Sequence, residues 1–125
     1  MNKITKIIVL CVVAVFAGGV VWYATRSTTP GITKNYDEFA KCLRDKKITM
    51  YGAYYCSHCQ DQKAAFGKSF QYVTYVECTQ EVQKCLDAKV NAYPTWIFPG
   101  AKTLVGFQEL SLLSRDSGCA LPAVQ

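Results

Sequence analysis

Two cysteines, Cys56 and Cys59, lie where an apolar, strand-like segment of this chain passes into a helix-like one. Residues 48–55 are mostly β-branched or aromatic, whereas residues 60–66 are helix formers that end at Gly67. This order predicts a strand, a turn and a helix, with Cys56 in the first helical turn. Unpaired backbone N–H groups and the positive end of the helix dipole stabilise a thiolate at that position. The pair is therefore predicted to exchange electrons with other thiols.

The two cysteines are predicted to have different roles. Cys56 is expected to be the exposed nucleophile, and Cys59, one helical turn deeper, to attack a mixed disulfide formed at Cys56. His58, the single histidine, is expected to add positive charge or a hydrogen bond beside the thiolate, which favours a donor of disulfides. The alternatives are a solvated surface imidazole for His58 and half of a zinc site for the cysteine pair.

The N-terminal quarter of the chain contains a long apolar segment. Residues 7–24 are 18 residues without a charge, about 27 Å as a helix, which is marginally enough to span the core of a bilayer. We therefore predict a cytoplasmic N terminus and one transmembrane helix within residues 1–26, a linker over 27–34 and a folded domain over 35–125.

The charges around this segment predict its orientation. Lys3 and Lys6 precede it and only Arg26 follows closely, which places the N terminus in the cytoplasm and the domain on the periplasmic or extracytoplasmic side. A cleaved signal peptide, with a small-residue site before Gly18, is the alternative. Six of the seven cysteines follow the segment, an even number on the side where disulfides persist. The net charge of +5 indicates no nucleic-acid partner, because these three cations supply most of it.

The remainder of the chain alternates between helical and extended patterns. Helices are expected over residues 36–46, 56–66, 80–88 and 108–117. Strands are expected over 48–53 and 72–77, and a two-stranded hairpin over 95–98 and 103–106. Parallel pairing of the first two strands and antiparallel pairing of the hairpin predict an α/β fold, with a central mixed sheet flanked by helices.

This order, the C-x-x-C motif and Tyr93-Pro94-Thr95 before the hairpin together resemble the thioredoxin fold. The resemblance implies that Pro94 is the cis-proline beside the dithiol. It also implies that the backbone of Tyr93 pairs with a bound substrate segment as a short added strand. Many thioredoxins have a buried carboxylate six positions before the first cysteine, where this chain has Met50. The proton acceptor for Cys59 is therefore unassigned.

A narrower resemblance covers about residues 39–119. It is to the thioredoxin-like domain that accompanies bacterial homologues of vitamin K epoxide reductase (VKOR), and it is carried by residues 50–56, 58–63, 75–78 and 93–96. The chain departs from that family at Tyr55, where tryptophan is usual, and at Ser57, where proline is usual. The resemblance implies an integral membrane partner of the VKOR type, which passes electrons from this dithiol to a quinone. No cofactor is expected on this chain.

The other cysteines downstream of residue 26 are expected to form disulfides. Cys78 and Cys85 stand at a strand-to-helix junction, where a structural disulfide is worth roughly 2.5 kcal/mol and a second redox pair is the alternative. Cys42 and Cys119 are then paired by elimination, and closing so long a loop is worth roughly 4.5 kcal/mol.

Aromatic side chains surround the motif in sequence. Tyr54 and Tyr55 are predicted to form an exposed rim that binds substrate, together with Tyr93 and Pro94. Trp96 and Phe98 are more consistent with core packing in the hairpin.

These observations predict a membrane-anchored thiol:disulfide oxidoreductase. It would introduce disulfides into exported proteins and be reoxidised by a VKOR-type, quinone-reducing membrane partner. Three alternatives remain: a reductase or isomerase fed by a membrane electron donor, a Cys/His metal-binding module, and a non-catalytic adaptor with a structural dithiol. No resident metal is predicted.

Overall fold

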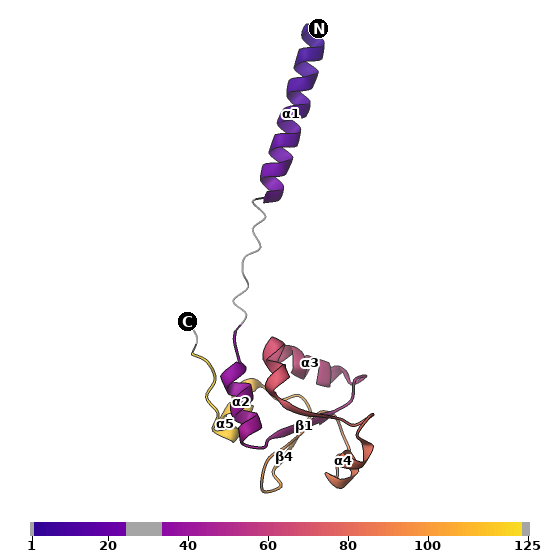
Figure 1. The fold of residues 1–125 in the computed structure, drawn as a ribbon, viewed down its shortest axis with the longest axis vertical. Coiled ribbons are helices and arrows are strands. Elements are labelled where there is room, and N and C mark those ends of the chain that lie inside the picture. The colour runs from indigo at the N-terminus through magenta and orange to yellow at the C-terminus, as the bar shows by residue number, and fades with distance from the viewer. Residues whose placement is uncertain (1, 25–33, 124–125) are drawn as a thin grey trace. The chain divides into compact units, whose positions relative to one another are not determined.

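The chain forms two units in the computed structural model. The structure describes the backbone of residues 2–24 and 34–123, and the side chains of residues 2–15 and 34–123. The units comprise residues 1–32 and 33–125. The first contains helix α1 (Lys3–Ala24), and the second contains the sheet and the helices packed on it (Figure 1). The linker predicted for residues 27–34 lies outside the described residues except at its last position.

The predicted membrane anchor is contradicted. Over the ranges that the structure describes, no helix is both long and apolar enough to cross a membrane. The prediction of one N-terminal transmembrane helix, and the single-pass localisation inferred from it, are therefore wrong by this criterion.

The second unit is built on a mixed four-stranded sheet with the order β2-β1-β3-β4. Its strands are β1 (Thr49–Gly52), β2 (Thr74–Glu77), β3 (Thr95–Ile97) and β4 (Thr103–Val105). β1 pairs with β2 in parallel and with β3 antiparallel, and β3 and β4 form the hairpin. The mixed α/β sheet predicted from the sequence is confirmed.

The register of the sheet separates two faces. Met50 lies between Tyr75 of β2 and Trp96 of β3, and these three residues contribute to the larger core cluster. The neighbouring pair, Tyr51 and Val76, contributes to a smaller cluster. Because side chains alternate along a strand, the two clusters lie on opposite faces of the sheet.

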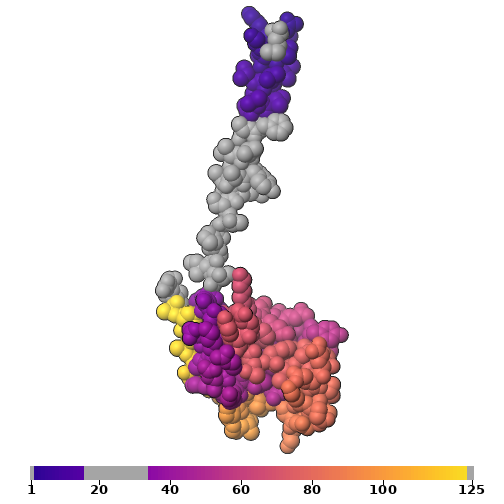
Figure 2. Space-filling model, viewed as in Figure 1, coloured from indigo at the N-terminus to yellow at the C-terminus, as the bar shows by residue number. Residues whose placement is uncertain are grey.

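Helices cover the sheet, and the core lies beneath them. They are α2 (Asp37–Asp45), α3 (Ser57–Phe66), η1 (Gly67–Tyr72), α4 (Val82–Asp87) and α5 (Leu110–Ser117) (Figure 1). The larger cluster joins α2, α3 and α5, and the rings of Phe39 and Phe66 stack in it with centroids 5.7 Å apart. Trp96 is fully buried and Phe98 nearly so, which agrees with the core role expected for both. In Figure 2 side chains of α2 and α4 lie toward opposite sides of the domain's visible face.

The second strand begins two residues later than the sequence indicated. The backbone of Gly67 has a φ of 56°, in the left-handed region that favours glycine, and the chain turns there into the 3-10 helix η1. Phe70 of η1 packs edge-on against Phe66 and Tyr75. Because η1 continues to Tyr72, β2 begins at Thr74 and not at residue 72.

A buried glutamine fastens α3 to the sheet. Gln62 is fully buried, and its Oε1 accepts hydrogen bonds from the backbone N–H of Gln108 at 2.7 Å and from Trp96 Nε1 at 3.3 Å. Its Nε2 donates to the carbonyl of Gln108 at 3.0 Å. Every polar atom of the Gln62 side chain is thus paired, as a buried amide requires. The helix that carries the dithiol is held at a defined depth over β3.

Replacing Gln62 with alanine is expected to lower the free energy of unfolding by about 2–4 kcal/mol, because it leaves a cavity and strands the Gln108 N–H and the Trp96 Nε1. Urea denaturation followed by circular dichroism measures this loss. Gln60→Ala, on the exposed face of the same helix, is the control and is expected to change stability by less than about 1 kcal/mol. Equal stability of the two variants would contradict the role given to Gln62.

Candidate active site

Cys56 and Cys59 occupy the N terminus of α3. Cys56 is the N-cap residue, half-exposed, with extended backbone angles, and its Sγ accepts a hydrogen bond from the backbone N–H of Cys59 at 3.2 Å. Both thiols are free in this structure. The backbone N–H of Cys59 therefore points at the half-exposed sulfur of Cys56.

Cys59 is the buried partner. Its side chain is fully buried, directly beneath the turn that presents Cys56. Burial raises the pKa of the Cys59 thiol to about 12; the hydrogen bond and charge of Cys56 add to the rise, whereas Ala53 and Lys63 act in the opposite direction. The site therefore combines one accessible sulfur with one that stays protonated at neutral pH.

The sulfur of Cys59 lies against the backbone of β1. A methyl group placed on Gly52 would lie only 2.8 Å from Cys59 Sγ, so the sulfur occupies space that any other residue at position 52 would need. The same methyl would lie 3.2 Å from Cε2 and 3.3 Å from Oη of Tyr75. Gly52 thus leaves room beside the end of β1 for both a sulfur and a phenol.

Tyr75 is held from three sides at this point. Its hydroxyl donates a hydrogen bond to Glu77 Oε2 at 2.7 Å, its ring meets Phe70 edge-on, and Lys63 Nζ lies 3.9 Å from the ring centroid. Burial raises the pKa of the Tyr75 hydroxyl, and the hydrogen bond to Glu77 adds to this rise.

Glu77 connects the end of β2 to the loop that precedes the dithiol. Its Oε1 accepts hydrogen bonds from the backbone N–H of Tyr54 at 3.1 Å and from Thr79 Oγ1 at 2.7 Å. Burial acts to raise the pKa of Glu77, but the hydrogen bonds from Tyr75, Thr79 and Tyr54 outweigh it and leave the pKa below its usual value. A negative charge is therefore present next to the Tyr75 hydroxyl at neutral pH.

Two tyrosines stand in the open beside Cys56. Tyr54 and Tyr55 are 68% and 64% exposed, and their rings meet edge-on with centroids 5.4 Å apart. The carbonyl of Tyr54 accepts a hydrogen bond from Gln60 Nε2 at 2.9 Å. This loop is fastened through its backbone, so the aromatic rings are left free to contact a partner.

His58 points to solvent. Its side chain is 69% exposed, and its Nδ1 lies 3.7 Å from Asp61 Oδ2, one helical turn away. A carboxylate thus lies beside this imidazole, and both the tuning role and the surface role stay open for His58.

Tyr93 and Pro94 lie in the loop immediately before β3. The Tyr93–Pro94 peptide bond is cis, and the carbonyl of Pro94 accepts a hydrogen bond from the N–H of Gly106 at 2.7 Å. Continued by one residue, the antiparallel register of β1 and β3 places Pro94 opposite Gly52. Pro94 is buried and Tyr93 is half-buried.

Four other cysteines form two disulfides. Cys42 of α2 is bonded to Cys119 beyond α5, and Cys78 is bonded to Cys85 of α4. Cys78 and Cys85 are each 5% exposed, which makes that bond hard to reach for a partner thiol. Among the described side chains, no group of three or more His, Cys, Asp or Glu residues could hold a metal ion.

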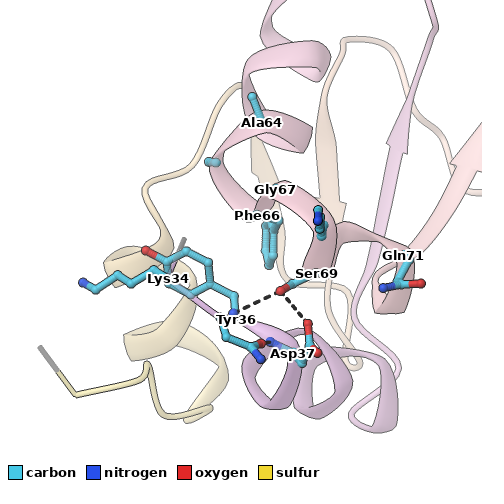
Figure 3. A pocket seen from close by; sticks show the side chains of 11 residues that line it. Lys34, Tyr36, Asp37, Ala64, Phe66, Gly67, Ser69 and Gln71 are labelled. Atoms are coloured by element: carbon cyan, nitrogen blue, oxygen red, sulfur yellow. Dashed lines mark hydrogen bonds between the residues drawn. The ribbon is translucent and has the colours of Figure 1, made fainter. Parts of the chain in front are cut away.

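A separate hollow lies at the other end of α3. It has a volume of about 490 Å³, and its lining residues come from the start of α2, the end of α3 and η1. Figure 3 shows Ser69 at its base, where its Oγ accepts from the Tyr36 N–H at 3.0 Å and donates to Asp37 Oδ1 at 2.6 Å. These bonds tie η1 to α2. Neither cysteine of the dithiol lines the hollow.

The fold and the site define a mixed α/β domain with a paired dithiol at a helix N terminus. The chain is 38% identical over 91 residues to the thiol-disulfide oxidoreductase LTO1 of Arabidopsis thaliana; the match covers 66% of this chain and 24% of that protein. The chain thus spans about a quarter of the length of this curated relative. No family model matches the chain.

Two solved thioredoxins were also compared with this structure. The thioredoxin of Fasciola hepatica is 19% identical, with a TM-score of 0.46 over 64% of this chain and 89% of that one. The oxidised thioredoxin of Plasmodium falciparum is 17% identical, with a TM-score of 0.43 over 66% of this chain and 91% of that one.

Reasoning from the sequence missed Gly52, Tyr75 and Glu77 as parts of the site. The period of a strand places residues 75 and 77 on one face of β2, and parallel pairing brings the ends of β1 and β2 to the same edge. That signal could have marked both residues. The approach of Cys59 to Gly52 is a contact between a helix and a strand, and no pattern along the chain predicts it.

Cys11 of α1 is a third free cysteine and is exposed, so it is replaced by serine in this test. In the Cys11→Ser background, iodoacetamide at pH 8 is expected to alkylate Cys56 and to leave Cys59 unmodified. At a pKa of about 12, only about one Cys59 in ten thousand is ionised at that pH, and its sulfur is buried. Peptide mapping by mass spectrometry measures both sites. Modification of Cys59 is expected to increase as the pH approaches 12; alkylation of Cys59 as fast as Cys56 in the folded protein would contradict this assignment.

Proposed function

We infer that this domain is a thiol-disulfide oxidoreductase that acts on protein thiols, with Cys56 as the attacking or attacked sulfur and Cys59 as the resolving one. The observation that carries this proposal is the difference between the two sulfurs. Cys56 is accessible and accepts an N–H hydrogen bond, whereas Cys59 is fully buried and one helical turn away. A partner sulfur reaches only Cys56, and Cys59 reaches only Cys56.

The proposed cycle follows from this asymmetry. A substrate thiolate attacks Cys56 in the Cys56–Cys59 disulfide, which forms a mixed disulfide and releases Cys59 as a thiolate that takes up a proton. A second substrate thiolate then attacks the mixed disulfide, so the substrate leaves oxidised and the domain is left as the dithiol. The reverse sequence of the same steps reduces a substrate disulfide.

The substrate is proposed to bind along Tyr54, Tyr55 and the Tyr93-Pro94 loop. The two exposed rings supply apolar contact area at little cost in side-chain entropy. The half-buried backbone before Pro94 offers hydrogen-bonding groups to an extended segment. Specificity for an unfolded or extended protein segment follows from these features.

The proposed direction is oxidation of substrate thiols, with a quinone-reducing membrane enzyme of the VKOR type as the partner that restores the disulfide. The hydrogen bond to Cys56 Sγ stabilises the thiolate, and therefore the reduced form, which makes the disulfide a stronger oxidant. The VKOR-type partner is proposed from the resemblance of residues 39–119. His58 is proposed to act in the same sense when it is protonated.

Replacing Cys59 with alanine is expected to accumulate mixed disulfides between Cys56 and protein substrates, because the resolving sulfur is absent. Non-reducing electrophoresis and mass spectrometry of trapped species measure this accumulation. The Cys56→Ala variant is the matched control and is expected to trap nothing. Trapping by neither variant, or equally by both, would contradict the proposed division of roles.

The reduction potential of the Cys56–Cys59 couple tests the direction. Equilibration with glutathione buffers is expected to give a value closer to about −120 mV than to about −270 mV, the range that proteins with this chemistry span. Replacing His58 with alanine is expected to move the potential toward the reducing end. A wild-type potential near −270 mV would identify a reductant and reverse the proposed direction while leaving the exchange chemistry intact.

A further inference from the structure

Cys59 must gain or lose a proton each time the active-site disulfide opens or closes, yet it is cut off from water. The side chain is fully buried, and its pKa lies far above neutrality. A buried carboxylate at position 50 of the adjacent strand would suit the transfer of this proton. The residue there is Met50, which is fully buried and cannot accept a proton. The proton therefore needs another route.

Titratable groups of α3 and β2 face Cys59. Within α3 they are the Cys56 sulfur and the Lys63 ammonium; from β2 they are Tyr75 and, behind it, Glu77. β1 contributes Met50 and Gly52, which do not titrate, and its Tyr51 packs on the opposite face of the sheet. Tyr93, in the loop before β3, packs against the same core cluster as Cys59.

Tyr75 is the group whose position suits proton transfer. Its hydroxyl and Cys59 Sγ both crowd the same point beside Gly52, at 3.3 Å and 2.8 Å from a methyl placed there. The hydroxyl proton already points at Glu77 Oε2, 2.7 Å away, which leaves oxygen lone pairs free to accept a proton from the sulfur. Glu77 is half-buried and reaches the exposed Tyr54 and Thr79, so the chain of groups ends at solvent.

We propose that the proton of Cys59 passes to and from solvent through the Tyr75 hydroxyl and the Glu77 carboxylate, which take the place of the buried carboxylate that this chain lacks. This inference rests on the proposed thiol-disulfide exchange and assigns it two further residues. Tyr75 is the relay beside the reacting sulfur, and Glu77 is the residue that orients the phenol and carries the proton onward.

The active-site disulfide closes by one exchange of sulfur–sulfur bonds and the transfer of one proton. Starting from a mixed disulfide at Cys56, Cys59 Sγ forms a bond to Cys56 Sγ, and the bond from Cys56 to the partner sulfur breaks. The bonding pair leaves with the partner as a thiolate, while the Cys59 proton moves to Tyr75 Oη as the Tyr75 proton moves to Glu77. Glu77 then releases a proton to water. The dithiol is oxidised, the partner disulfide is reduced, and the opening of the disulfide is the same path reversed.

The test is a single-turnover reaction of the reduced full chain, in a Cys11→Ser background, with glutathione disulfide. Acid quenching and mass spectrometry follow first the glutathione adduct at Cys56 and then its loss as Cys59 closes the disulfide. Tyr75→Phe keeps the ring, its packing on Phe70 and its contact with Lys63, and removes only the hydroxyl. Tyr72→Phe is the matched control, since its ring contacts Lys41 and η1 packs against α2.

The Tyr75→Phe variant is expected to form the adduct at the wild-type rate and to lose it about tenfold or more slowly at pH 7. The deficit is expected to shrink as the pH rises toward the pKa of Cys59, because hydroxide then removes the proton directly. Glu77→Gln, which keeps the amide oxygen as an acceptor but cannot carry a proton, is expected to show the same pH signature. Tyr72→Phe is expected to leave both steps unchanged.

Adduct loss at the wild-type rate in both Tyr75→Phe and Glu77→Gln would overturn the relay while leaving the proposed function in place. A slowing that is equal at every pH would also overturn it, because that pattern indicates a merely structural role. Failure of the wild type itself to form an adduct at Cys56 would instead remove the proposed function on which the relay rests.

Discussion

The contact between the Cys59 sulfur and the backbone of Gly52 is the constraint around which the site is arranged. With a side chain at position 52 the sulfur would have no room, since even a methyl group would lie 2.8 Å from it. The contact brings the start of α3 down onto the end of β1, and so it determines how deep the second cysteine lies. Burial in turn keeps Cys59 protonated and leaves Cys56 as the sulfur that partners meet.

Two polar attachments keep that contact in register. At the middle of α3, the fully paired amide of Gln62 links the helix to Trp96 and to the Gln108 backbone. At its start, Glu77 holds the loop before Cys56 through the Tyr54 N–H. Because a buried amide is costly unless it is paired, the Gln62 bonds specify one position for the helix, which apolar packing alone would leave less defined. The same Glu77 that secures the loop also contacts the phenol next to Cys59, so structure and chemistry share one residue.

The two disulfides support the domain from its edges. Cys42–Cys119 ties the region after α5 to α2 across 77 residues of sequence, and Cys78–Cys85 closes a short turn between β2 and α4. A small domain buries only a modest core, and disulfides add stability that such a core does not supply. The nearly buried Cys78–Cys85 bond begins at the residue after Glu77, so it also steadies the strand end on which the relay is built.

The sequence by itself determined the local elements and the chemistry of the motif, because both depend on neighbours along the chain: the apolar residues before Cys56, the helix formers after Cys59 and the turn before the hairpin. It placed the start of the second strand at residue 72, where η1 still continues, because a strand pattern does not show the packing of Phe70 on Phe66 and Tyr75. Its prediction of a membrane anchor is contradicted, since no described helix is both long and apolar enough to cross a membrane. Only the tertiary structure decided that Cys59 and Tyr75 both lie beside Gly52, and that Glu77 reaches Tyr54. Those contacts join segments up to 23 residues apart, and their distances follow from how a helix packs on a sheet, which no local pattern encodes.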